Sequence, residues 1–365
     1  MELLQKYRDP ELGKQILLRI KHQVGRPLRI MEVCGTHTVA ISRFGIRELL
    51  HGILDFRSGP GCPVCVTDSG EIDQMVELAK LPNVIVVTFG DLMKVPGSYS
   101  SLSQEKTKGC DVRIVYSPLD GLKIARDNPQ KQVVFLGIGF ETTIPVFSLC
   151  LEEAMEKGIG NFSVLSAQKT VPPALEALLN DAAINIDGFI LPGHVSAILG
   201  RQCFEFLASK YNMPAVITGF EPVDILAAVA LLCEMICQGQ AKVLNAYTRV
   251  VREEGNPAAK SAIDKFFIPV PAVWRGLGLI PASGMRLREE YAMFDAGRIF
   301  EINLSPAQLL PGCVCGEVLK GKITPRECQL FGNACSPVHP VGPCMVSSEG
   351  ACMAYFQYEG GMGRV

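Results

Sequence analysis

The chain has no excess of basic residues: 35 Lys and Arg stand against 37 Asp and Glu, which gives a formal net charge of −2 at pH 7. Proteins that bind nucleic acid or anionic membranes normally carry a basic excess, so this balance argues against both classes. No uncharged apolar run reaches 18 residues, and the N-terminus lacks the apolar segment of a signal peptide. The composition therefore predicts a soluble protein of the cytoplasm.

Charged residues are also sparse, at 20%, whereas apolar residues make up 48% of the 365-residue chain. A chain of this length is too long for one simple core and has ample material for buried sheets. Short β-rich runs alternate with helical stretches, which is typical of βαβ units and a parallel sheet. The runs are 28–33, 53–56, 84–88, 112–116, 133–138, 162–165, 188–191 and 215–218.

These runs are too many for one compact sheet, so we predict an α/β fold with two doubly wound parallel-sheet domains. We place them at residues 26–127 and 128–245. After residue 245, Pro and Gly interrupt regular structure, which is typical of a small domain held together by a metal cofactor. We assign residues 246–365 to a smaller, irregular iron–sulfur domain, and we expect a helix in residues 1–25 to pack onto it.

Cysteine, by contrast, is abundant, with 14 residues. In a reducing compartment, closely spaced cysteines indicate metal binding or catalysis rather than a disulfide framework. Cys34, Cys62 and Cys65 follow the first two predicted strands. Ligands of open parallel sheets bind outside the carboxyl ends of the strands, so we expect these three thiols in one cleft. Five others lie in apolar or helical surroundings and are predicted to be small core residues: Cys110, Cys150, Cys203, Cys233 and Cys237.

The sequence Cys62-Pro63-Val64-Cys65 spaces two thiols so that they can form a disulfide or bind one metal. N-cap candidates for a helix reaching about residue 80 follow at 67–71, and a helix N-terminus lowers the pKa of a nearby thiol. The alternative is a turn with two small buried apolar side chains.

Cys34-Gly35-Thr36-His37 places a thiol, a hydroxyl and an imidazole at one strand end. A second thiol loop at the neighbouring strand end favours a functional role for Cys34. A Cys–His nucleophile pair, as in thiol hydrolases, is an alternative, and so are a structural Cys34 and a hydrogen-bonded, structural His37.

Other strand ends carry polar residues with weaker signals. The Gly-x-Gly pair at 137–139 lacks the third glycine of a dinucleotide fingerprint, so Glu141 and Thr142 are better interpreted as a polar wall or as contacts for a docked protein. The loops at 192–196 and 221–224 carry one imidazole and two carboxylates, which could act in acid–base catalysis. Capping of a helix by Ser196 or Asp224 is the alternative.

Six cysteines lie between residues 313 and 352. Four of them, Cys315, Cys328, Cys335 and Cys352, have gaps of twelve, six and sixteen residues, which match neither a zinc ribbon nor a ferredoxin. The chemistry favours an iron–sulfur cluster over structural zinc. Cys313 and Cys344 are then spare, although either is able to displace a neighbour from the ligand set.

Taken in order, these motifs resemble the HypD family of hydrogenase maturation proteins over essentially the whole chain. The resemblance implies a scaffold on which the Fe(CN)2CO unit of [NiFe]-hydrogenases is assembled. It also implies a complex with HypC, cyanide from HypE with HypF upstream, and the hydrogenase large subunit as an indirect partner. The motifs that carry it are 34–37, 59–65, 139–143, 192–196, 274–276 and 315–352.

The same resemblance implies a [4Fe-4S] cluster on Cys315, Cys328, Cys335 and Cys352, and a redox-active pair at Cys62 and Cys65. Releasing cyanide from a thiocyanate formally requires two electrons, which a dithiol gives when it closes to a disulfide. A one-electron cluster is able to reset that disulfide in two steps.

Soft thiolates suit a low-spin iron with strong-field ligands. We therefore predict Cys34 and one of Cys62 or Cys65 as ligands of the transient iron, with another thiolate from HypC. These three cysteines and His37 are our candidate catalytic residues, in an assembly scaffold with redox activity rather than a freely turning-over enzyme. Two alternatives remain: an iron–sulfur-dependent protein disulfide reductase, and a zinc-stabilised interaction module.

Overall fold

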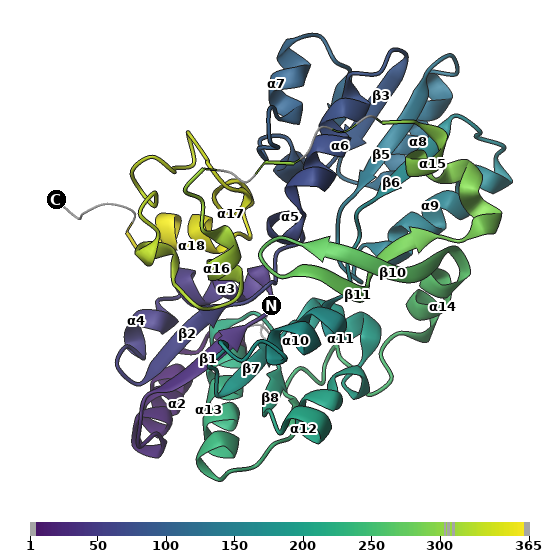
Figure 1. Cartoon of the computed structure of the whole chain (residues 1–365). Coiled ribbons are helices and arrows are strands. Elements are labelled where there is room, and N and C mark those ends of the chain that lie inside the picture. Colours follow the sequence, from purple (N-terminus) through teal and green to yellow (C-terminus); the bar gives the residue numbers. More distant parts are fainter. Residues whose placement is uncertain (1–4, 303, 305–306, 309–310, 361–365) are drawn as a thin grey trace.

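The computed structural model describes residues 5–302, 304, 307–308 and 311–360. It is an α/β fold with two parallel sheets and a two-stranded antiparallel hairpin (Figure 1), so the predicted fold class is confirmed. None of the described helices is long and apolar enough to cross a membrane.

The first sheet has five parallel strands in the order β2-β1-β7-β8-β9. Its strands are mostly buried, as expected of a parallel sheet covered on both faces. Helices α2 and α13 cover one face, where Ile20 and Val229 join its core. The elements are β1 (Leu28–Glu32), β2 (Leu54–Ser58), β7 (Gly188–Leu191), β8 (Ala215–Ile217), β9 (Val243–Asn245), α2 (Pro10–Gln23) and α13 (Pro222–Cys237).

The second sheet has four parallel strands in the order β4-β3-β5-β6. Every residue of β3 is buried. Phe135 and Phe147 meet edge to face where α9 covers the sheet, with ring centroids 5.1 Å apart. The elements are β3 (Val84–Thr88), β4 (Val112–Ile114), β5 (Gln132–Gly137), β6 (Phe162–Ser166), α8 (Pro118–Asp127) and α9 (Ile144–Glu156).

The division of the chain between the sheets differs from the predicted boundary at residue 128, which falls between two strands of the second sheet. The chain leaves the first sheet after β2, builds the whole second sheet, and returns at β7 beside β1. Alternating strands and helices reveal each βαβ unit but not which strand pairs with which. The ranges 26–127 and 128–245 therefore do not correspond to the two sheets.

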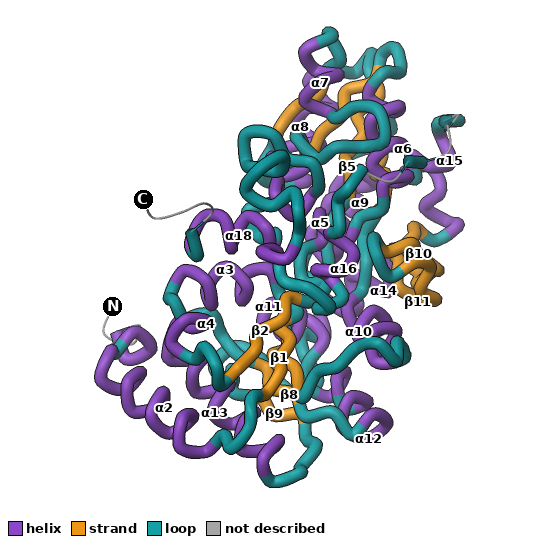
Figure 2. The backbone as a smooth tube through the Cα atoms, turned by 60° about the vertical axis from the view of Figure 1, so that its left-hand side comes forward, coloured by secondary structure: helices purple, strands orange, loops and turns teal. Residues whose placement is uncertain are grey.

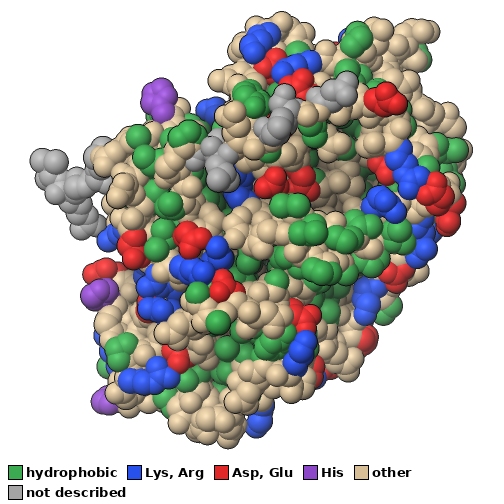
Figure 3. All heavy atoms as spheres, viewed as in Figure 1, with side chains coloured by type: hydrophobic (Ala, Val, Ile, Leu, Met, Phe, Trp, Pro, Cys, Tyr) green, Lys and Arg blue, Asp and Glu red, His purple; other side chains and the backbone are tan. Residues whose placement is uncertain are grey.

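An antiparallel hairpin, β10 (Phe267–Trp274) and β11 (Gly278–Leu287), follows helix α14 (Pro257–Phe266). Phe266, Phe267 and Leu287 belong to the core around Phe147. The base of the hairpin thus packs with the second sheet, and only its tip reaches the cysteine-rich end, so residues 246–365 do not form the one domain that was predicted. Figure 3 shows apolar side chains on the outer surface of the hairpin, where Leu279 is exposed.

The N-terminal helix α2 packs along α13 and not on the cysteine-rich end, so that prediction was wrong. Ile20 is fully buried, and Arg19 forms an ion pair with Glu234 at 2.7 Å. Pro10, which interrupts the apolar pattern, is the first residue of the helix, and Asp9 caps it.

The C-terminal unit, residues 311–360, consists of short helices and turns. Its last helix lies beside α3 (Gly35–Arg43) in Figure 2. Thr36 and Ser42, at opposite ends of α3, donate hydrogen bonds to Glu349 and Glu359, both at 2.6 Å, so the two helices run parallel. The unit's elements are α16 (Cys315–Leu319), η5 (Pro325–Glu327), α17 (Pro343–Val346) and α18 (Ala351–Tyr358).

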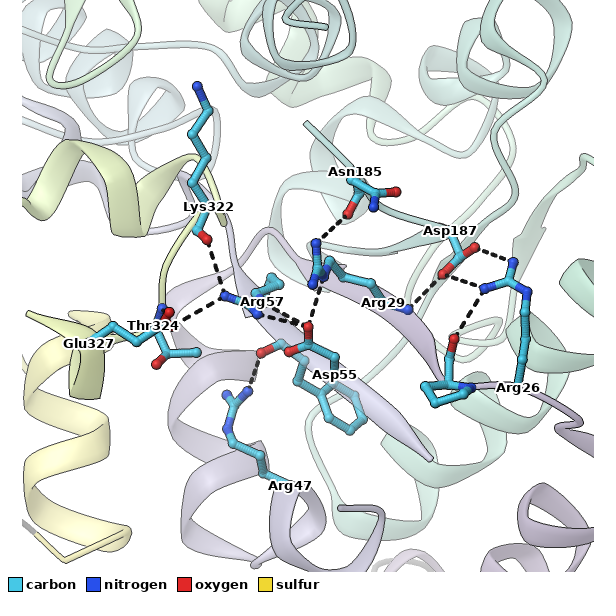
Figure 4. A network of polar contacts seen from close by, with 12 residues as sticks. Arg26, Arg29, Arg47, Asp55, Arg57, Asn185, Asp187, Lys322, Thr324 and Glu327 are labelled. Carbon is cyan, nitrogen blue, oxygen red and sulfur yellow. Dashed lines mark hydrogen bonds and ion pairs between the residues drawn. The ribbon is translucent and has the colours of Figure 1, made fainter. Parts of the chain in front are cut away.

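A polar network also fixes this unit to the edge of the first sheet (Figure 4). Arg57 on β2 donates to the Lys322 carbonyl at 3.4 Å and forms an ion pair with Glu327 at 3.5 Å. Its guanidinium also pairs with Asp55, which accepts from Arg29 as well. Partial burial raises the pKa of Asp55, but the hydrogen bonds from Arg57 and Arg29 outweigh it and hold that pKa below its ordinary value.

Candidate functional site

Cys34 is the N-cap residue of α3, directly after β1, and only 7% of it is exposed. Burial raises the pKa of the thiol to about 12, and the nearby Glu349 carboxylate adds to the shift. Backbone hydrogen bonds from His37 and Thr36 work in the opposite direction. The thiol is therefore protonated at neutral pH, and a metal that binds it must displace the proton.

The Gly59-Pro60-Gly61 turn brings the CxxC motif against Cys34. Strands β1 and β2 run parallel in register, and the Gly35 N–H donates to the Gly61 carbonyl at 3.0 Å. A β-carbon on Gly61 would overlap the backbone of Cys34, so only glycine permits this approach. The expected grouping of Cys34 with the CxxC motif is thus present.

Cys62 and Cys65 form a disulfide, with their α-carbons 5.2 Å apart, and both are buried. The turn between them is the short helix α5 (Pro63–Val66), and the Cys65 N–H donates to Cys62 Sγ at 3.2 Å. The predicted helix follows as α6 (Ser69–Ala79), with a capping box between Asp68 and Glu71. The pairing shows that the spacing permits dithiol–disulfide exchange.

His37 is fully buried and does not form a Cys–His pair in the described structure. Its Nε2 lies 3.0 Å from the Gly219 carbonyl and donates to it, and its ring contacts Phe220 with centroids 4.6 Å apart. Burial lowers the pKa of His37 to about 4, so the ring is neutral at pH 7, and Nδ1 has no described partner. His194, in the first turn of the helix that follows β7, stacks on the same Phe220.

Glu141, after β5, is buried and accepts a hydrogen bond from the Val171 N–H at 2.8 Å. Burial raises the pKa of its carboxyl to about 7. A β-carbon on the preceding Gly139 would lie 2.9 Å from the Thr143 β-carbon, so that glycine serves close packing. Lys169, whose N–H donates to the Gly139 carbonyl at 3.0 Å, is also fully buried and pairs with Glu71 at 2.9 Å. It was not among the predicted site residues, although its place after a strand was a usable signal.

We expect Glu141→Gln to change how stability depends on pH. Between pH 4.5 and about 7 the folded state keeps a proton on Glu141 that the unfolded state has released, so rising pH destabilises the wild type across this window. The loss amounts to about 3 kcal/mol, and the Gln variant should lack it. Denaturant unfolding of both proteins at pH 5 and pH 8 measures the difference. Identical pH dependence would show that Glu141 is already ionised at pH 5.

Neither helix-capping alternative holds, because Pro192 and Glu221 are the N-cap residues of their helices. Ser196 is buried inside its helix, and Asp224 pairs with Arg249.

The four predicted cluster ligands line one cavity in the C-terminal unit, the cysteine pocket. Three of them are buried, and Cys328 is partly exposed. The Val341 N–H donates to Cys335 Sγ at 3.3 Å, a contact that stabilises a thiolate ligand. The remaining walls include Val314, Val318, Leu330, Phe331 and Met345.

The two spare cysteines of this unit also lie at the pocket. Cys313 Sγ is 3.1 Å from Cys315 Sγ, and the Cys344 thiol lies close to those of Cys315 and Cys352. The contact with Cys315 and the positive charge of Arg275 lower the pKa of Cys313. Gly342 closes the pocket, since a β-carbon there would lie 2.5 Å from Cys313 Sγ.

The donor set fits an iron–sulfur cube. In the described part of the chain no group of three or more His, Cys, Asp or Glu side chains is arranged to hold a single metal ion. A [4Fe-4S] cube binds each thiolate to a different iron, so its four sulfurs need not converge on one point. A largely apolar cavity that is lined by these four cysteines and Cys313, and that a side chain at Gly342 would obstruct, meets that requirement.

The cysteine pocket and the CxxC motif touch through short elements. Helix α17, which carries Cys344, contacts α5, the turn between Cys62 and Cys65. Ser347, Ser348 and Glu349 then bridge the two sheets: the two serines donate to Asp91 after β3, and Glu349 accepts from Thr36 after β1. The thiol site at the sheet ends and the cysteine pocket are therefore neighbours in space.

The remaining cysteines divide by burial. Cys150 and Cys233 are fully buried, as predicted, and Cys110 and Cys203 are partly buried. Cys237 is exposed near the end of α13, so its assignment to the core was wrong.

A parallel α/β fold with a buried disulfide, a lone thiol beside it and an adjoining cysteine pocket defines a protein whose cysteines gather at two neighbouring sites. The profile of the family described as "HypD: Hydrogenase formation hypA family" matches residues 11–359. The chain belongs to the HypD family, whose curated members are hydrogenase maturation factors.

Three relatives named "Hydrogenase maturation factor HypD" illustrate the likeness. The protein of Rhodobacter capsulatus is 45% identical over 372 residues, which cover 99% of both chains. That of Escherichia coli (strain K12) is 46% identical over 368 residues, or 98% of both chains. That of Azotobacter vinelandii is 42% identical over 367 residues, or 98% of this chain and 97% of the relative.

Proposed function

We propose that this protein is the scaffold on which the Fe(CN)2CO unit of [NiFe]-hydrogenases is assembled. One observation carries the proposal: Cys34 lies directly against the CxxC loop, which places a lone thiol beside a dithiol that closes to a disulfide. The lone thiol serves as an iron ligand, and the dithiol supplies electrons while one of its two cysteines is a second iron ligand. The iron with its CN and CO ligands is the cargo, which passes onward towards the hydrogenase large subunit.

A thiocyanate on HypE and the two thiols of Cys62 and Cys65 give the HypE thiol, cyanide, one proton and the Cys62–Cys65 disulfide. The S–CN bond breaks, the S–S bond forms, and two electrons pass from the thiols to the leaving cyanide. Either cysteine alone lacks the second electron, so the pair is needed.

A resident [4Fe-4S] cluster on Cys315, Cys328, Cys335 and Cys352 would supply single electrons beside this dithiol. Residues of the chain exclude water from the thiol site and position its elements. Burial excludes water from Cys34, Cys62 and Cys65. The neutral His37 ring is tied to the Gly219 carbonyl and fixes the start of α3, so we assign it a positioning role.

The function is tested by expressing the chain with HypC and HypE of the same genome in a strain that lacks its own HypD. We expect hydrogenase activity to be restored and HypC to co-purify with the chain. Abundant folded protein without hydrogenase maturation would contradict the proposal. The disulfide reductase alternative predicts many turnovers with protein disulfides and reduced ferredoxin, whereas a scaffold should give no free turnover.

We also propose that HypC docks close to Cys34 and His37, because its thiolate must reach the same iron. Gly35 is a poor probe, since a β-carbon there would lie 2.6 Å from Glu349 and disturb the fold itself. His194 is exposed and stacks on Phe220, which contacts His37.

We therefore expect His194→Glu to weaken HypC binding at least about tenfold, a cost of ~1.4 kcal/mol. His51→Glu, an exposed control in the turn before β2, at the opposite end of that strand from the CxxC loop, should leave affinity unchanged. Calorimetric titration with purified HypC measures both. Equal affinity of all three proteins would place the partner elsewhere.

A further inference from the structure

The tip of the β10–β11 hairpin is anchored to the segment that follows the CxxC motif. The Arg275 N–H donates to the Val66 carbonyl at 2.8 Å, and Trp274 forms a β-bridge with Thr67. The Arg275 side chain holds the same segment: Nε donates to the Thr67 carbonyl and Nη1 to Ser69 Oγ, both at 3.0 Å. Three donors of one residue thus fix the chain just after Cys65.

The other side of the tip presses against the cysteine pocket. Gly276 has a φ of +81°, and a β-carbon on it would overlap Gly316, the residue after Cys315. A β-carbon on Gly316 would likewise lie 2.7 Å from the Gly276 α-carbon. The two backbones are therefore in direct contact, and the hairpin tip is wedged between the two thiol sites.

The hairpin is held rigidly in this position. Trp274 is fully buried, donates from Nε1 to Ser283 Oγ at 2.8 Å, and stacks on Phe140 with centroids 5.8 Å apart. This packing also fixes the neighbouring Arg275. A positive charge that is held in one place stabilises a nearby negative centre more than a mobile charge does.

The Arg275 side chain has one nitrogen without a hydrogen-bond partner among the described residues. That nitrogen, Nη2, is buried, and the next residue, Gly276, lies against Gly316 beside Cys315 of the pocket. A buried guanidinium nitrogen without a partner is costly, so it indicates an acceptor that is absent from the polypeptide. Thiolates and the sulfides of an iron–sulfur cluster are acceptors of that kind.

We propose that Arg275 links the two thiol sites: it fixes the CxxC segment against the cysteine pocket and raises the reduction potential of the cluster held there. The inference rests on the proposed [4Fe-4S] cluster. Adding an electron makes a thiolate-bound cluster more negative, and a fixed positive charge nearby favours that state. Arg275 is a positioning residue, since it acts through the cluster and the backbone.

The test compares Arg275→Met, Arg275→Lys and the control Arg288→Met in full-length, anaerobically purified protein. Arg288 lies just beyond β11 and donates to the Asp264 carbonyl, at the other end of the hairpin. Redox titration by electron paramagnetic resonance gives the midpoint potential of the cluster. Stopped-flow mixing with excess dithionite, which re-reduces the cluster so that it delivers the two electrons in two steps, gives the rate at which the disulfide opens.

We expect Arg275→Met to lower the equilibrium constant for cluster reduction about tenfold, which is 59 mV for a one-electron couple, and to slow disulfide opening. Arg275→Lys should keep most of the reduction potential of the cluster, because lysine keeps the positive charge. It should slow disulfide opening, because lysine lacks the two guanidinium nitrogens that hold Thr67 and Ser69. Equal potentials in the wild type and Arg275→Met would overturn the role of Arg275 while leaving the proposed function intact. A wild-type protein without a cluster would overturn both.

Discussion

Replacing any one of Cys315, Cys328, Cys335 or Cys352 with Ala is expected to lower the iron and sulfide content of anaerobically purified protein at least about tenfold. All four line one apolar cavity in a unit built from short helices and turns. Such a unit has little core of its own, so the loss of a ligand should also loosen its packing on α3. Iron and sulfide assays, with the visible absorption of the protein, measure the result.

The structure supplies matched controls for this series. Cys150→Ala removes a buried thiol from α9 in the second sheet's core, far along the chain from the pocket, and should leave the cluster untouched. Cys313→Ala and Cys344→Ala should also retain it. Full iron and sulfide content in Cys328→Ala, the partly exposed member, would contradict the ligand assignment.

Replacing Cys62 or Cys65 with Ser should abolish the two-electron couple at the sheet ends and leave the cluster in place. The two cysteines are paired across α5, and no other cysteine forms a disulfide in the described structure. Since the proposed cyanide release draws both electrons from this pair, neither variant should sustain it. Thiol titration under controlled potential measures the couple, and iron assay confirms the cluster.

Cys34→Ser is the control for these variants, because Cys34 is unpaired and should not contribute to the couple. It should titrate as the wild type does. If Cys62→Ser still exchanged two electrons at the wild-type potential, the electrons would have to come from another pair, and the role given to the CxxC motif would be wrong.

Local features of this structure were predictable from sequence, because each depends on neighbouring residues. The capping box at Asp68 and Glu71 lies within four residues, and α6 begins where it indicates. The Gly61 turn precedes Cys62 directly, and parallel strands bring their carboxyl ends to one edge. The grouping of Cys34 with the CxxC motif followed from that rule.

Features that depend on distant pairing were not predictable. Nothing in residues 188–191 indicates that β7 pairs with β1 rather than with β6, and this one choice moved the domain boundary. The apolar face of α2 fits α13 and would fit another apolar surface as well, so its partner was misassigned. Arg275 was visible only as part of a motif, since its role arises from Val66, Thr67 and Gly316, which are remote in sequence.

The central claim is that Cys34 acts purely as an iron ligand, whereas Cys62 and Cys65 carry the two-electron couple and one of them also binds the iron. Infrared spectroscopy of the protein isolated with HypC tests it most directly, because iron-bound CO and CN⁻ absorb in an otherwise empty spectral window. The account predicts both sets of bands in the wild type. It predicts none in Cys34→Ser, although that variant keeps its cluster and its dithiol couple. Full-intensity bands in Cys34→Ser would show that the CxxC motif holds the iron without Cys34 and would contradict the account.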